Sequence, residues 1–192
     1  MKNKKTIYEM SLLAILIALL WLLDLTGIGY IPIGTGLTIT ILVFPVAIAA
    51  ICIGKKGGIL LGLMFGLTSY LTAVSGKDPV GNILFQEHPM QLAVVCIVSR
   101  ILMGLGVALI YQGLSKLIKN DIIAITVASI SGTFLNTIFF LTFFWAFFNN
   151  QENLFKVLIT AMSVNFLIEL IVNTILSIGL SKVVHLFKKR IA

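Results

Sequence analysis

Residues 91–111 read QLAVVCIVSRILMGLGVALIY, an apolar run that is interrupted near its middle by one arginine, Arg100. About 20 apolar residues in an α-helix cross the hydrocarbon core of a bilayer, so this run predicts a membrane-spanning helix. A guanidinium group at that depth costs roughly 2.5 to 3.5 kcal/mol on insertion scales. We therefore expect Arg100 to face the protein interior and to meet an anionic partner there.

The whole chain has the composition of an integral membrane protein. Of its 192 residues, 59% are hydrophobic and only 11% are charged, unlike the composition of soluble domains. We expect a single all-α membrane domain over residues 1–192, without a separate catalytic or nucleotide-binding domain. Six apolar segments predict six transmembrane helices. These segments are residues 8–25, 37–53, 58–74, 91–111, 122–148 and 156–187.

The distribution of lysine and arginine predicts the orientation. Eleven of the 14 basic residues fall on one side of the predicted spans, whereas Lys77 and Lys156 fall on the other. Cytoplasmic connections carry the excess of Lys and Arg, so both termini are expected in the cytoplasm and the chain in the cell membrane. The net charge of +7 is explained in this way, and we expect the lipid bilayer, not nucleic acid, as a partner.

The last segment carries a polar stripe. Asn165, Glu169 and Asn173 recur every four residues, so each step turns only about 40° around a helix and the three share one face. In lipid such a face must turn inward. Glu169 lies at a depth comparable to that of Arg100.

Two other segments carry polar groups in the half of the membrane away from the termini. One has Thr68, Ser69 and Thr72, and the other has Asn136 with Phe140 one turn further on. The cytoplasmic half has nothing comparable. The pattern predicts an outward-biased ligand pocket that is not a continuous channel.

The chemistry of these residues indicates a small organic acid as the ligand. The planar fork of Arg100 suits a carboxylate, and asparagine both donates and accepts hydrogen bonds, which suits amides and hydroxyls. A buried Arg100–Glu169 ion pair that only fixes helix packing is the alternative. The surrounding asparagines and threonines favour a ligand.

Catalytic signatures do not occur in the sequence. There is no G-x-S-x-G, no H-E-x-x-H, no acidic metal cluster and no Walker motif, each of which a corresponding chemistry requires. We therefore expect no catalytic activity, no metal and no cofactor. The longer outer connections contain candidates for a lid over the pocket: Tyr30, Asn82, Phe85 and Gln86.

Small residues at four-residue spacing occur in two segments. Gly58, Gly62 and Gly66 let a neighbouring helix approach closely, and packing within the chain is favoured over a dimer interface. Ala14 and Ala18 have the same spacing in the first segment.

Several stretches together resemble the S components of energy-coupling factor (ECF) vitamin transporters. They are Ala14-x-x-x-Ala18, FPVAIAAICIGKKGGILLGLMFGLTS at residues 44–69, SRILMGL at 99–105, GTFLNT at 132–137 and NFLIE at 165–169. The resemblance covers nearly the whole chain and is strongest to the pantothenate-specific members. Riboflavin, folate and other vitamin S components share the architecture and stay open as alternatives.

The resemblance implies a division of labour. The S component binds the vitamin outside, while a membrane coupling protein and two ATP-hydrolysing subunits drive import. It implies that Ala14 and Ala18 dock on the coupling protein, and that the S component topples in the membrane to release its ligand.

For this chain it suggests that Arg100 holds the pantothenate carboxylate and that Asn136, Asn165 and Asn173 hold its amide and hydroxyl groups. Glu169 would orient Arg100 or accept a hydrogen bond from a ligand hydroxyl group. A self-contained secondary transporter, a small channel, and an intramembrane enzyme or assembly protein are the alternatives from other classes.

Overall fold

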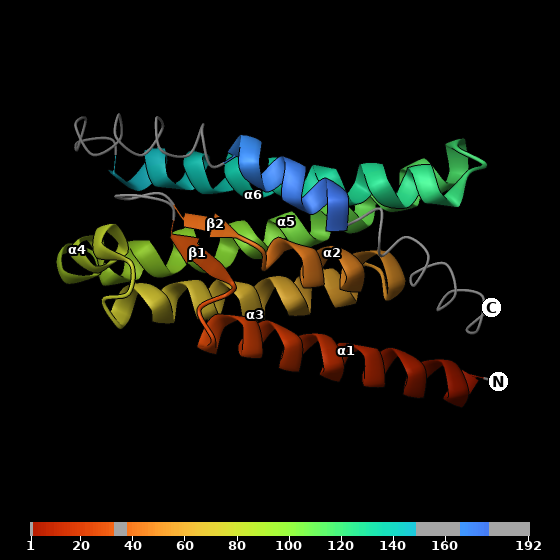
Figure 1. Cartoon of the computed structure of the whole chain (residues 1–192), viewed down its shortest axis with the longest axis horizontal. Helices are drawn as coiled ribbons and strands as arrows, with labels where there is room; N and C mark the ends of the chain where they lie inside the picture. The colour runs from red at the N-terminus through yellow and green to blue at the C-terminus, as the bar shows by residue number, and fades with distance from the viewer. Residues whose placement is uncertain (1, 33–37, 149–165, 177–192) are drawn as a thin grey trace.

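The described part of the chain is a helical bundle with one short β-hairpin (Figure 1). The computed structural model describes residues 2–32, 38–148 and 166–176. The labelled elements are α1 (Lys2–Leu25), β1 (Tyr30–Pro32), β2 (Thr38–Thr40), α2 (Val43–Cys52), α3 (Lys55–Val74), α4 (Pro79–Glu87), α5 (Pro89–Leu117) and α6 (Asp121–Phe148). An unlabelled helix, Phe166–Leu176, is drawn in blue beside α6 in Figure 1.

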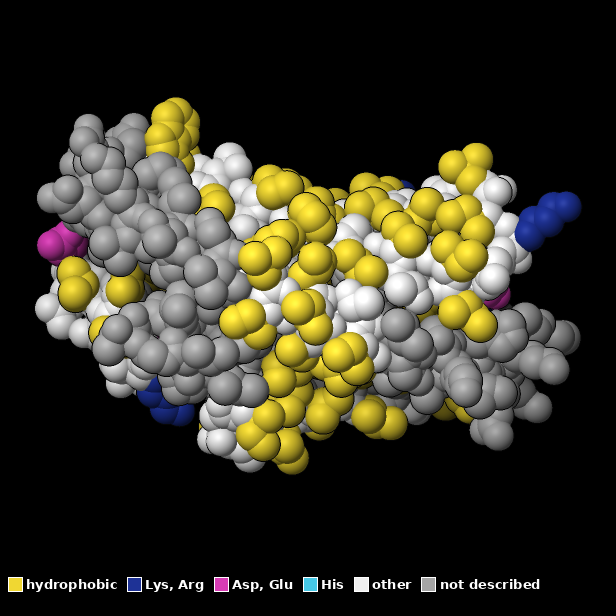
Figure 2. Space-filling model, turned by 45° about the horizontal axis from the view of Figure 1, so that its top comes forward, with side chains coloured by type: hydrophobic (Ala, Val, Ile, Leu, Met, Phe, Trp, Pro, Cys, Tyr) yellow, Lys and Arg dark blue, Asp and Glu magenta, His cyan; other side chains and the backbone are white. Residues whose placement is uncertain are grey.

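Four helices, α1, α3, α5 and α6, are long and apolar enough to cross a membrane. Four of the six predicted segments are therefore helices of the expected kind. Hydrophobic side chains cover the middle of the face in Figure 2, and the charged ones lie toward its two ends. This surface suits a multi-pass membrane protein.

The predicted span over residues 37–53 differs in the structure. Its first residues, Thr38–Thr40, form β2, and the helix α2 has only 10 residues. A helix of that length rises about 15 Å, roughly half of a bilayer core. The alternation of threonine and isoleucine from Thr38 to Ile41 has the period of a strand, and a hydropathy window does not separate it from the helix. The segment at 156–187 is described only over Phe166–Leu176.

Helix α5 occupies the centre of the bundle, where it packs against α2, α3, α4 and α6. Its contact with α3 depends on glycine. A methyl group on Gly58 would collide with the carbonyl oxygen of Gly104, and one on Gly62 with that of Arg100. The interpretation of these glycines as packing within the chain is confirmed, because the two backbones approach too closely for any side chain.

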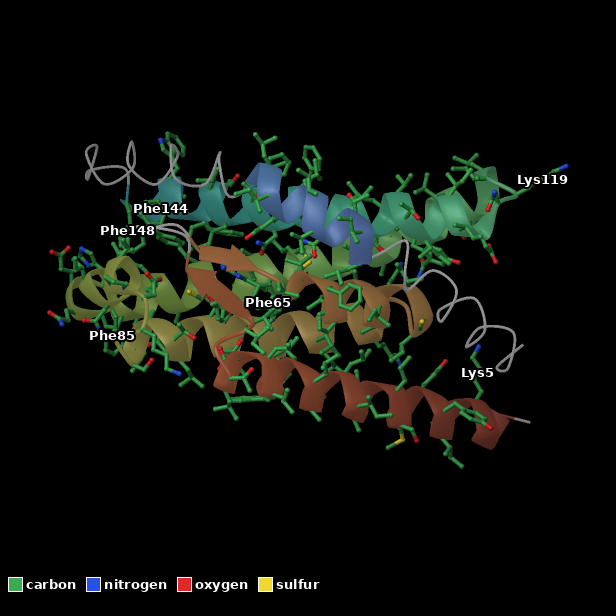
Figure 3. The ribbon with its side chains drawn as sticks, viewed as in Figure 1. Lys5, Phe65, Phe85, Lys119, Phe144 and Phe148 are labelled. Atoms are coloured by element: carbon green, nitrogen blue, oxygen red, sulfur yellow. The ribbon has the colours of Figure 1, made fainter. Side chains whose placement is uncertain are left out.

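Two apolar clusters lie along the bundle. One includes Leu20, Leu61 and Met103, and the other includes Leu92 and Phe144. Arg100 falls between them on α5. In Figure 3, Phe85, Phe144 and Phe148 lie at one end of the bundle, called here the α4 end, and Lys5 and Lys119 lie at the opposite end.

Candidate ligand-binding site

Arg100 is buried in the bundle, with only 7% of its surface exposed. Its guanidinium carbon lies 4.8 Å from the ring centroid of Phe140 on α6 and 5.4 Å from that of Phe65 on α3. Both are cation–π distances. Phe140 was expected at the site, whereas Phe65 was not. The two rings flank the charge, and no carboxylate within the described residues forms an ion pair with it.

The hydrogen bonds of Arg100 use only part of its donor set. Its Nη1 donates to Ser99 Oγ at 2.9 Å and to the Val95 carbonyl oxygen at 3.4 Å, both on its own helix. Its buried Nε has no hydrogen-bond partner among the described residues. A guanidinium group has five N–H donors, so Arg100 keeps donor capacity for an anion.

Glu169, on the helix Phe166–Leu176, is also buried, with 6% exposure. Its Oε1 accepts a 2.8 Å hydrogen bond from the backbone N–H of Thr40 in β2. Glu169 is therefore held by the hairpin, and the alternative of a direct Arg100–Glu169 ion pair is not what the structure adopts.

A second polar contact joins the helix Phe166–Leu176 to α6. Asn173 Nδ2 donates to Thr133 Oγ1 at 2.9 Å, and both residues are buried. Asn136 lies one turn from Thr133 on α6, and its buried Oδ1 has no partner within the described part of the chain. The predicted inward polar stripe is thus present at Glu169 and Asn173. Asn165 lies outside the described residues.

The three polar residues of α3 have different surroundings. Thr68 is fully buried and donates to the Phe65 carbonyl oxygen. Ser69 donates to Cys96 Sγ on α5 at 3.8 Å. Thr72 donates to Thr68 O and lies 3.3 Å from Asp24 Oδ1 of α1. Thr72 therefore faces α1, whereas Thr68 and Ser69 face the interior near the hairpin.

The hairpin contributes residues that hydropathy did not place at the site. Its register aligns Tyr30 with Thr40, so the Tyr30 ring and the N–H that binds Glu169 come from one strand pair. Tyr30 is one of the lid candidates, and its hydroxyl is buried. The strand-like alternation at residues 38–41 was the sequence signal from which the hairpin could have been predicted.

The remaining lid candidates belong to α4. Asn82 donates to the Ala73 carbonyl oxygen at 3.1 Å and accepts from Gln86, while the rings of Phe85 and Tyr70 meet edge to face. Phe140, Phe144 and Phe148 stack in sequence along α6. A row of aromatic rings thus runs from Phe140, beside Arg100, toward the α4 end.

Ala14 and Ala18 lie on the exposed face of α1. The opposite face packs into the bundle through Leu16 and Leu20, which are buried. The face that the resemblance assigns to docking is therefore available to a partner.

A multi-pass helical bundle that buries a cation, a carboxylate and amides in one region defines a membrane protein with a polar site inside it. The sequence model of the family described as "ECF transporter, substrate-specific component" matches residues 9–181, and the chain belongs to this family. The predicted family is confirmed.

Two relatives refine the comparison. The "Pantothenate transporter PanT" of Leuconostoc mesenteroides subsp. mesenteroides is 32% identical over 115 residues, which cover 58% of this chain and 54% of that protein. The "Pantothenic acid transporter PanT" of Lactococcus lactis subsp. cremoris is 29% identical over 151 residues, covering 72% of this chain and 73% of that protein. The chain thus spans about half the length of the first relative and nearly three quarters of the second.

Proposed function

We propose that this chain is the substrate-binding subunit through which an ECF-type importer takes up pantothenate. The observation that carries the proposal is the buried Arg100, which lies between two aromatic rings and has an Nε without a partner among the described residues. A ligand carboxylate fits this arrangement, because it accepts paired N–H bonds from a guanidinium fork. The names of the two relatives point to an acid of this kind.

The other polar residues suit the rest of pantothenate, which has one amide and two hydroxyl groups. The Asn136 amide, whose buried Oδ1 has no partner in the described residues, is assigned to the ligand amide. Asn173 and Asn165 are assigned to the hydroxyl groups. Glu169 accepts a hydrogen bond from one of these hydroxyls through Oε2, because Oε1 already accepts from Thr40. Thr68 and Ser69 line the α3 side. Phe140 covers the guanidinium, and Thr72 acts only through its contact with α1.

Transport requires further subunits under this proposal. The chain belongs to the substrate-specific components, and we assign the energy to two ATPase subunits acting through a membrane coupling protein that docks at Ala14 and Ala18. Both termini are assigned to the cytoplasm, and the α4 end to the outside. The lysines gathered at the other end, including Lys5 and Lys119 (Figure 3), support this orientation through the positive-inside rule.

Calorimetric titration of the detergent-purified protein tests the substrate. Pantothenate is expected to bind tightly with one site, and riboflavin and folate are expected to give no heat. Tight binding of another vitamin with none of pantothenate would overturn the substrate and leave the family intact.

Reconstitution tests the division of labour. Liposomes that contain this chain alone are expected to take up no labelled pantothenate, and uptake should require the coupling protein, the ATPases and ATP. ATP-independent uptake by the chain alone would instead establish the secondary transporter.

A further inference from the structure

The hydroxyl group of Tyr30 is a buried polar group without a hydrogen-bond partner among the described residues. The hydroxyl groups of Thr68 and Ser69 on α3 are its polar neighbours. Both donate elsewhere: Thr68 to the Phe65 carbonyl oxygen and Ser69 to Cys96 Sγ. Buried polar groups in proteins are almost always paired, so this hydroxyl is an exception that needs an explanation.

The hairpin fixes where the Tyr30 side chain goes. Gly29 is anchored at the end of α1 by its N–H bond to the Leu23 carbonyl oxygen at 2.8 Å, and Ile41 N–H donates to Gly29 O at 3.1 Å. In an antiparallel ladder the hydrogen-bonded pairs alternate with pairs that are not bonded to each other. Because Gly29 and Ile41 are bonded, the next pair, Tyr30 and Thr40, is of the second kind.

This register explains the link to Glu169. In a pair that is not hydrogen-bonded, the N–H of Thr40 points away from β1, and here it donates to Glu169 Oε1. The bond ties β2 to the helix Phe166–Leu176. Tyr30 thereby lies on a hairpin that is held against the region that contains Glu169.

The electrostatic surroundings of Tyr30 make it a neutral donor. Burial raises the pKa of Tyr30 above its ordinary value, and the positive charge of Arg100 opposes this effect only in part. The phenol therefore keeps its proton at neutral pH. On α3, Thr68 lies beside this hydroxyl and one turn from Phe65, whose ring centroid is 5.4 Å from the guanidinium carbon of Arg100. The phenol and the guanidinium therefore border the same part of α3, and a neutral O–H there is suited to the same acceptor as the cation, which is a carboxylate.

We propose that Tyr30 is a ligand-binding residue whose hydroxyl donates to the carboxylate held by Arg100, so that the β1–β2 hairpin forms one side of the binding site. The carboxylate has two oxygens, and each accepts more than one hydrogen bond. The guanidinium of Arg100 and the phenol of Tyr30 therefore bind it together. This inference rests on the proposed pantothenate function and adds a residue to it.

Removal of the hydroxyl tests the inference. Tyr30→Phe is expected to weaken pantothenate binding in calorimetry about tenfold or more, as for loss of one hydrogen bond to a charged group. The substitution should weaken the binding of pantothenol, in which CH₂OH replaces the carboxylate, much less. The melting temperature of the ligand-free variant should not fall, because the hydroxyl has no partner in the described residues of the empty protein.

Tyr111→Phe is the matched control, since Tyr111 is a buried tyrosine near the end of α5 away from α4. It should bind pantothenate as the wild type does. Wild-type affinity in Tyr30→Phe would overturn the inference alone, and so would an equal loss for both ligands with a lowered melting temperature. Absence of pantothenate binding by the wild type would overturn the proposed function and the inference with it.

Discussion

The buried face of α5 and the exposed face of α1 each carry side chains that are unusual for a membrane helix. Around Arg100, charged and polar groups are enclosed where apolar side chains would be usual. Around Ala14 and Ala18, small side chains lie outside, where large apolar ones would be usual. The first arrangement suits a polar ligand, and the second permits close approach of another helix. Under the proposed function, binding and docking reside on separate helices, so each can be removed by mutation without the other.

Arg100→Ala is expected to have the largest effect on pantothenate affinity. It removes two or more charge-assisted hydrogen bonds to the ligand, each worth about 1.5 to 3 kcal/mol, so the dissociation constant should rise about 100-fold or more. Calorimetry measures the loss, and a thermal melt of the ligand-free protein shows whether the variant is folded. Arg100→Lys keeps the charge without the planar fork. Its dissociation constant should lie between those of the wild type and Arg100→Ala. Unchanged binding in folded Arg100→Ala would contradict the assigned role.

Glu169→Gln should weaken binding less. The glutamine side-chain oxygen can still accept the hydrogen bond that Thr40 N–H donates to Glu169, so the hairpin stays attached. The bond to a ligand hydroxyl loses its charge assistance, which costs about five- to tenfold in affinity. Glu87→Gln, on the exposed surface at the α4 end, is the control for removal of one negative charge. Equal affinities of the two variants would show that Glu169 does not touch the ligand.

Gly62→Ala tests the packing that positions Arg100. The added methyl group would collide with the Arg100 carbonyl oxygen, and overpacking of this kind lowers the free energy of unfolding by about 1 to 3 kcal/mol. The melting temperature should therefore fall. The affinity for pantothenate should fall only if the added methyl group displaces Arg100. Gly113→Ala is the matched control on α5, because nothing lies within 4 Å of its added methyl group. A melt unchanged by Gly62→Ala would mean that α3 and α5 can separate freely there.

Ala14→Leu and Ala18→Leu should leave pantothenate affinity unchanged and should abolish uptake in the reconstituted transporter. Their larger side chains lie on the exposed face of α1 and hold the coupling helices away. Ile15→Leu, which adds no volume at a residue that is 64% exposed, should retain uptake. Loss of ligand binding in the alanine variants would instead place this face in the binding site.

Much of the site could be predicted from the sequence, because membrane burial of a polar residue is costly wherever the helix lies. Arg100, Asn136, Glu169 and Asn173 had to face inward, and all four are buried. Phe65 could not be found in this way, because an apolar residue in a spanning helix is compatible with lipid, core or site.

The sequence by itself determined the class of protein, the family and the inward direction of the polar side chains, since hydropathy and residue type are local properties. Tertiary structure alone decided the partner of each group. It put aromatic rings over Arg100, and it attached Glu169 to Thr40 across 129 residues of chain. It also buried the Tyr30 hydroxyl beside Thr68 and Ser69 of α3. These contacts depend on the register of a three-residue strand pair and on a glycine seam between α3 and α5, neither of which a local pattern specifies.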